Sequence, residues 1–195
     1  VRRELRGLTD EDRVAFFDAA EVIFKVGCAE GKATYGRKFD CISTFTRLHA
    51  DLAGDPYCDH AHDGYGFLNQ HVGLALWFEH ALQSVNNLVA LPYWDYTIDE
   101  HAVLSAEPGT VDLNVWWHSE LWSDDWFGPA CPRDHIVDSG RWAYISVEQQ
   151  AWNVSMWTNS YGMLRAPWNN NRAPYVTRSN TTYGFVLTDP VIHYV

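Results

Sequence analysis

The amino-acid sequence predicts a mainly α fold, an antiparallel helical bundle wrapped in long irregular loops. Three segments repeat apolar residues at the spacing of one helix face, and much of the remaining chain is rich in glycine, proline, aspartate and tryptophan without such a period. The length of 195 residues and the hydrophobic content of 47% suit one buried core. We therefore expect one domain over residues 1–195. We expect it to be incomplete at its C-terminus, because residues 189–195 carry no terminating signal.

The first expected helix begins after Thr9, which can cap it, and Asp12 can return the second hydrogen bond of a capping box. One face of this helix collects four apolar residues: Val14, Phe17, Ala20 and Phe24. Gly27, Gly31 and Gly36 follow, and we expect them to interrupt the helical pattern.

A second helix is expected over residues 42–52 and a third over residues 67–85. The apolar spacing places His49 on the buried stripe of the second helix and His71 on that of the third. A loop that contains His62 connects the two helices. The sequence therefore predicts histidines that project into the bundle.

The rest of the chain predicts little regular structure. Residues 101–144 indicate an irregular, packed connection with room for one short helix. A later helix is predicted near residues 147–158, and residues 166–180 are typical of a loop.

Charge and hydropathy exclude two classes of partner. The net charge of −11 comes without a run of lysine or arginine, whereas nucleic acids and anionic membrane surfaces need a basic face. No apolar stretch approaches the roughly 20 residues that span a bilayer. We expect no nucleic-acid partner and no transmembrane segment.

Cysteines and sequons favour a secretory or lumenal location. Four cysteines allow three complete disulfide pairings, and their spacing does not choose among them: Cys28, Cys41, Cys58 and Cys131. Asn153 and Asn180 stand in glycosylation sequons and are candidate modification sites.

The histidines indicate a metal centre. A lone histidine on an apolar stripe is more often a hydrogen-bonded core residue than a ligand, but two helices and a loop here supply three. Three neutral imidazoles suit copper or zinc, so we predict that the ring nitrogens of His49, His62 and His71 surround one point. Three other histidines are interpreted as surface or structural residues: His101, His118 and His135. His60 and His80 are interpreted as residues that lie behind the ligands or at the surface.

A set of sequence motifs contains or adjoins these histidines. Residues 62–71 read HDGYGFLNQH, Glu79 follows in the same helix, and residues 92–95 read PYWD. This combination resembles the copper-A signature of the type 3 copper proteins, the tyrosinase and catechol oxidase family. Three further segments resemble parts of that family: residues 2–9, 44–49 and 174–178, the last as in proteins of unicellular algae.

The resemblance implies a set of ligands. His49, His62 and His71 would bind copper A, and His193 would be the first ligand of copper B. Four residues would support them: Phe67 beside the metal, Glu79 in the ligand-bearing helix, Asp95 in the helix packing and Cys58 near the loop. Some family members join such a cysteine to a histidine by a thioether, but the spacing here favours a disulfide.

Two expectations concern the surroundings of the third ligand. Gln70 and Val72 stand where the family usually has tryptophan and arginine, so the chemistry at the entrance is expected to differ. The large rings of Tyr93 and Trp94 predict burial of residues 92–95 against the helix that carries His71.

The resemblance also implies a function: oxidation of phenols and catechols to o-quinones by dioxygen at two coppers. The 195-residue chain alone is expected not to oxidise catechols, because it supplies one complete set of ligands plus His193. The alternative is a non-catalytic subunit of the same fold in a larger assembly. A reversible oxygen carrier and a mononuclear zinc hydrolase are weaker alternatives, the latter because no HExxH motif occurs.

Overall fold

The computed structural model describes residues 1–53, 60–62, 64–105, 115–116, 118–146 and 174–177. Its helices are η1 (Leu5–Gly7), α1 (Asp10–Lys25), α2 (Cys28–Tyr35), α3 (Ile42–Ala53), α4 (Gly66–Val85), α5 (Tyr96–Ser105) and η2 (Glu120–Trp122). The predicted mainly α class is confirmed, and the β pairing in this part of the chain consists of isolated bridges. The chain separates into two compact units, Val1–Tyr93 with Ile145–Arg172 and Trp94–Tyr144 with Ala173–Val195. The single domain over residues 1–195 stays a prediction.

Helix α1 begins where the sequence predicts. The Oγ1 of Thr9 accepts a hydrogen bond from the backbone N of Asp12 at 3.2 Å, which caps the first turn. The carboxylate of Asp12 pairs with Arg3 instead of forming the predicted second hydrogen bond of the capping box. The buried face runs through residues 16, 17, 19, 20 and 23 and turns away from Val14, which is 50% exposed.

Helix α2 corrects the prediction of a break at three glycines. Gly27 and Gly36 do bound the helix, and Gly36 has the positive φ of 88° that favours glycine. Gly31 lies inside the helix, and the absence of a Cβ there leaves room for the ring of Phe39. A Cβ there would lie 1.9 Å from that ring, so Gly31 allows close packing and does not end the helix.

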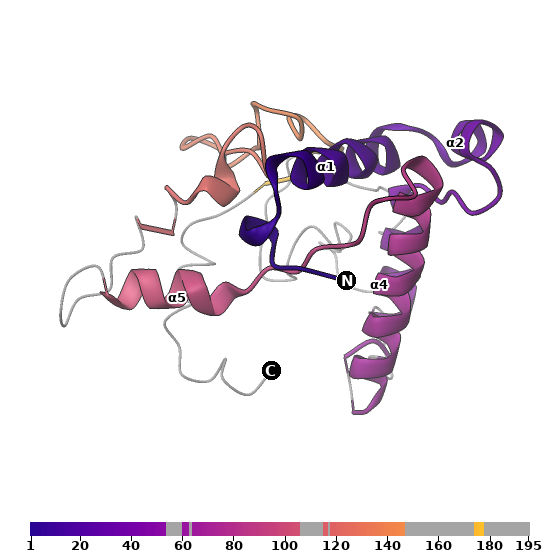
Figure 1. Cartoon of the computed structure of the whole chain (residues 1–195), viewed down its shortest axis with the longest axis horizontal. Coiled ribbons are helices and arrows are strands. Elements are labelled where there is room, and N and C mark those ends of the chain that lie inside the picture. Colours follow the sequence, from indigo (N-terminus) through magenta and orange to yellow (C-terminus); the bar gives the residue numbers. More distant parts are fainter. Residues whose placement is uncertain (54–59, 63, 106–114, 117, 147–173, 178–195) are drawn as a thin grey trace. The chain divides into compact units, whose positions relative to one another are not determined.

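Helix α1 packs against α4 in the first unit (Figure 1) and also contacts α3. Phe45 of α3 meets Trp77 and Phe78 of α4 edge-on, with ring centroids 5.4 Å and 5.2 Å apart. The buried carboxylate of Asp40 accepts a hydrogen bond from Trp77 Nε1 at 2.8 Å and pairs with Lys32 Nζ at 2.9 Å. The bond between Trp77 and Asp40 joins α4 to the segment that precedes α3. Helix α3 carries His49 and α4 carries His71.

The chain after α4 returns alongside the N-terminal segment, and the expected burial of the 92–95 motif is wrong. The backbone N of Tyr93 donates to Arg3 O at 3.0 Å, and Leu5 N donates to Tyr93 O at 2.9 Å. These bonds hold the backbone while the ring of Tyr93 is 52% exposed. Trp94 begins the second unit, its ring is 41% exposed, and its Nε1 donates to the buried Asp99 at 2.7 Å.

The second unit contains α5, which begins before residues 101–144, the range in which the sequence analysis allows one short helix. Helix α5 begins at Tyr96, and Asp95 Oδ1 accepts hydrogen bonds from the N and Oγ1 of Thr97 at 3.1 Å and 2.6 Å. Asp95 thus serves the first turn of α5. The irregular connection beyond it is confirmed over the described part of residues 115–146, where Val137 N donates to Val176 O at 3.1 Å. The predicted helix at 147–158 lies outside the described residues.

Candidate metal centre

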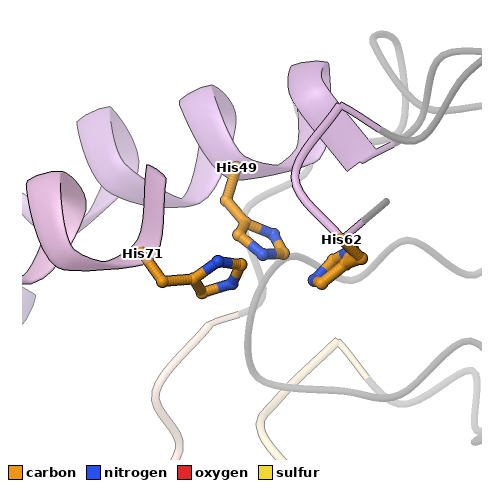
Figure 2. Close-up of side chains that lie close together, drawn as sticks. All are labelled: His49, His62 and His71. Atoms are coloured by element: carbon orange, nitrogen blue, oxygen red, sulfur yellow. The ribbon is translucent and has the colours of Figure 1, made fainter. Parts of the chain in front are cut away.

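Three imidazole rings meet in the first unit. His49 comes from α3, His71 from α4 and His62 from the loop before α4. One nitrogen of each ring lies within 4.8 Å of the corresponding nitrogens of the other two, and Figure 2 shows the rings directed toward one another. Metal–nitrogen bonds of about 2.0–2.1 Å limit the distance between two ligating nitrogens to about 4.2 Å, so small side-chain movements would seat one ion.

A backbone hydrogen bond selects the tautomer of the neutral His71 ring. Its Nδ1 lies 2.8 Å from the carbonyl oxygen of Phe67, one turn earlier in α4. Because a carbonyl only accepts, Nδ1 carries the proton and Nε2 keeps a free lone pair. Such a bond also fixes the ring orientation, an arrangement typical of metal-binding histidines.

Phe67 covers the centre on one side. Its ring centroid lies 4.7 Å from that of His71 and 6.4 Å from that of His62. His49 and His71 are half-buried, whereas His62 is exposed. The centre therefore has an apolar wall and one side open to solvent.

Glu79 lies further along α4 and ties the helix to two neighbouring segments. Its Oε2 accepts hydrogen bonds from Arg2 Nε at 2.8 Å and from the backbone N of Leu91 at 2.9 Å. Burial raises the pKa of the Glu79 carboxyl. The hydrogen bonds from Arg2 and Leu91 and the charge of Arg2 outweigh burial, so the pKa lies below its ordinary value of 4.5. Glu79 therefore stays ionised and fastens α4 to the chain on both sides.

Other predicted site residues lie elsewhere or outside the described part. Four candidates fall outside the described residues: Cys58, Asn153, Asn180 and His193. Asp95 belongs to the second unit and caps α5. Of the five other histidines in the described residues, four are exposed and His135 is half-buried; the exposed ones are His60, His80, His101 and His118. Within the described residues, the one cluster able to hold a metal ion is formed by His49, His62 and His71.

The structure pairs Cys28 with Cys41, with Cα atoms 4.8 Å apart. This pairing was one of those that the sequence left open. Among the described residues Cys131 carries a free thiol. The disulfide expected at Cys58 stays a prediction.

Two supporting carboxylates were missed by sequence reasoning. Asp40 bonds Trp77 on α4, and Asp99 bonds Trp94 in the second unit. Both are buried, with exposed fractions of 8% and 4%. Neither stands in a periodic apolar stripe, so only the pairing of a buried carboxylate with an indole N–H, visible in three dimensions, reveals them.

Comparison with known proteins identifies the family. Residues 39–184, about three quarters of the chain, match the family described as the common central domain of tyrosinase. The chain therefore belongs to the tyrosinase family, and the matched segment includes residues of both compact units.

Three relatives agree with this assignment. Grixazone synthase of Streptomyces griseus is 34% identical over 106 residues, which is 51% of this chain and 30% of that protein. Tyrosinase-like protein 2 of Margaritifera margaritifera and the tyrosinase-like protein of Pinctada maxima are each 27% identical over 128 residues, 66% of this chain and 23% of theirs. The chain thus spans less than a third of the length of these curated relatives.

The residues present fit the metal that this family implies. Three imidazole nitrogens are donors that copper accepts in both of its common oxidation states, and three protein ligands leave a position for a further ligand.

Among the described residues, the helices are too short or too polar to span a bilayer.

Proposed function

We propose that this chain supplies the copper-A part of a type 3 copper oxidoreductase that oxidises phenols and catechols to o-quinones with dioxygen. The observation that carries the proposal is the convergence of His49, His62 and His71 within a chain of the tyrosinase family. Bound copper would supply the one-electron couple and the open coordination position for oxygen.

The chain's own residues would prepare the site. The hydrogen bond to Phe67 O presents Nε2 of His71 as a ligand before any metal arrives. The ring of Phe67 would exclude water from one side, and the exposed ring of His62 would close over the metal from the loop. Glu79, held by Arg2, would keep α4 in register with the chain around it.

The test is Cu(I) titration of the chain against a competing chelator. Wild type should bind one equivalent at the triad, and His71→Ala should weaken binding by more than the roughly 10–100-fold typical of losing a residue behind a ligand. His80→Ala is the matched control, since it removes an exposed imidazole from the same helix. Equal losses in the two variants would contradict the assignment.

A second measurement separates oxidation from binding alone. Copper-loaded chain is mixed with a catechol, and quinone absorbance is followed with His71→Ala beside it. We expect no turnover from the 195 residues and His71-dependent turnover from a longer polypeptide that holds a second set of ligands. Copper binding without turnover in that longer polypeptide would favour the non-catalytic subunit. Turnover by the 195 residues would show that they complete a two-copper site by another route, such as dimerisation.

The disulfide supports a secretory or lumenal location for the protein. Bonds such as Cys28–Cys41 persist in oxidising compartments and are rare in the cytosol. Glycosylation at Asn153 or Asn180 would be consistent with that location, and mass spectrometry of the native protein would detect it.

A further inference from the structure

The disulfide between Cys28 and Cys41 lies at the start of the helix that carries His49. Cys28 is the first residue of α2, and Cys41 directly precedes α3. His49 follows about two turns into α3. The disulfide therefore attaches the N-terminal end of α3, one of the two helices that supply the candidate metal centre, to α2.

The sulfur of Cys28 accepts two hydrogen bonds. The backbone N of Cys41 donates to Cys28 Sγ at 3.3 Å. Thr44 Oγ1 lies 3.3 Å from the same sulfur, and the Thr44 hydroxyl is the donor, because a disulfide sulfur carries no proton. Cys28 also stands in the first turn of α2, where the first backbone N–H groups give the helix end a partial positive charge.

These surroundings stabilise a thiolate at Cys28 more than they stabilise a disulfide sulfur. A hydrogen bond to an anion is about twice as strong as one to a neutral acceptor, and a helix N-terminus favours a negative charge. The carboxylate of Glu30 in the same turn opposes this effect, but it is exposed and screened by solvent. Stabilisation of the reduced form makes a disulfide easier to reduce.

The two cysteines differ in exposure, which indicates how a thiol would open the bond. Cys28 is half-buried, whereas Cys41 is 6% exposed. A reductant thiolate would attack Cys28 Sγ, break the S–S bond and release Cys41 as a thiolate. A second reductant thiolate would attack the reductant sulfur of the mixed disulfide and release the Cys28 thiolate. The two reductant thiols supply two electrons and two protons and leave as their own disulfide.

We propose that glutathione opens the Cys28–Cys41 bond in the folded protein and that opening it weakens metal binding at the triad. The second effect is a regulation of the candidate centre and rests on the function proposed above. Glutathione is the reductant that keeps thiols reduced in the cytosol. The triad would therefore bind metal tightly where the surroundings are oxidising and the disulfide is closed.

Helix α3 links the disulfide to the triad. With the bond open, Asp40 still holds the preceding segment through Lys32 and Trp77, but α3 loses its covalent attachment to α2. The start of α3 gains freedom, and His49 is held less closely against His71. A ligand that is held loosely must be ordered when the metal binds, and this ordering lowers the affinity.

The first experiment incubates the folded, metal-free 195-residue chain with reduced glutathione, blocks free thiols with iodoacetamide and identifies the modified cysteines by mass spectrometry. The Cys28–Cys41 bond should open in a glutathione buffer that leaves ordinary structural disulfides closed. Thr44→Val removes one donor to the sulfur and should shift the equilibrium toward the disulfide by roughly tenfold. Thr34→Val makes the same change at an exposed position of α2 and should leave the equilibrium unchanged.

The second experiment measures the effect on α3 and on the triad. Hydrogen exchange of the glutathione-reduced, metal-free wild type should show lost protection in the first turn of α3. Cys28→Ser with Cys41→Ser removes both thiols, which could themselves bind copper, and it should bind Cu(I) at least about tenfold more weakly than oxidised wild type in competition with a chelator. Circular dichroism of the double variant checks that the fold is retained.

The outcomes separate this proposal from the proposed function. A bond that stays closed in glutathione would overturn the proposal, and equal shifts in Thr44→Val and Thr34→Val would overturn the role of the Thr44 hydroxyl. Equal Cu(I) affinities of the folded double variant and oxidised wild type would overturn the link to the triad. Failure of oxidised wild type to bind copper would overturn the proposed function instead, and the glutathione experiment would still decide whether the bond is reducible.

Discussion

Replacing Gly31 by alanine tests the packing that sequence reasoning misread. Gly31 lies in the interior of α2, where alanine is ordinarily preferred to glycine by about 1 kcal/mol. Propensity alone therefore predicts that Gly31→Ala stabilises the protein. The contact with Phe39 predicts the opposite sign.

The magnitude follows from the geometry around Phe39. An added Cβ would lie 1.9 Å from the ring, whereas ordinary contacts begin at 3.4 Å, so the ring or the helix must move by about 1.5 Å. Phe39 is fully buried and stacks on Tyr35 with ring centroids 5.4 Å apart. Overpacking of a core costs typically about 1–3 kcal/mol, and expelling a phenylalanine costs about 3–5 kcal/mol. The steric cost exceeds the gain in propensity, and we expect a net loss of about 2 kcal/mol.

The assay is equilibrium unfolding in urea followed by tryptophan fluorescence and by circular dichroism. Gly73→Ala in α4 is the matched control, because a Cβ there meets nothing within 4 Å and should stabilise by up to about 1 kcal/mol. The two glycine-to-alanine changes should thus shift the midpoint in opposite directions. A midpoint for Gly31→Ala at or above that of wild type would refute the reasoning.

Two further predictions concern covalent and ionic links. Cys28→Ser with Cys41→Ser opens a loop with a sequence separation of 13 and should lower the free energy of unfolding by about 3 kcal/mol; unchanged stability on adding reductant to wild type would contradict this. Glu79→Gln should destabilise by about 1–3 kcal/mol at neutral pH, because it weakens charge-assisted hydrogen bonds. The lowered pKa of Glu79 stabilises the fold above its ordinary value of 4.5, and this stabilisation is lost as pH falls through the folded-state pKa. The difference between wild type and Glu79→Gln should therefore shrink below about pH 4, and a difference that does not depend on pH would contradict the argument.

The boundaries of α1, α3 and α4 and the histidine cluster were predictable because they depend on local pattern. Thr9, followed by apolar residues at helical spacing, predicts the start of α1, and the apolar spacing around His49 and His71 places both rings on inward faces. His62 has no period, since it lies in a loop, and it was grouped with them because that loop leads directly into the helix that carries His71. The structure brings all three together. Their role as copper ligands stays a prediction that the titration tests.

The features that sequence reasoning missed depend on partners distant in the chain. Nothing local distinguishes Gly31, which admits the ring of Phe39, from a glycine that ends a helix. Tyr93 and Trp94 were predicted to be buried because large rings usually are, but backbone pairing with Arg3 holds Tyr93 while its ring faces outward. Both cases concern the direction of a side chain relative to a segment that periodicity does not locate.

Helix α4 carries apolar residues on more than its inward face. The helix is apolar nearly all round, and Leu68, Val72 and Leu76, spaced four residues apart, are 61%, 64% and 46% exposed. The stripe that contains His71 is the longer one, because Leu74, Phe78 and Leu82 continue it, whereas Glu79 and His80 follow the exposed stripe. The structure shows which stripe faces inward: the imidazole of His71, held by Phe67 O, is directed at His49 and His62, whereas the exposed stripe of Leu68, Val72 and Leu76 is centred roughly 100° around the helix from His71.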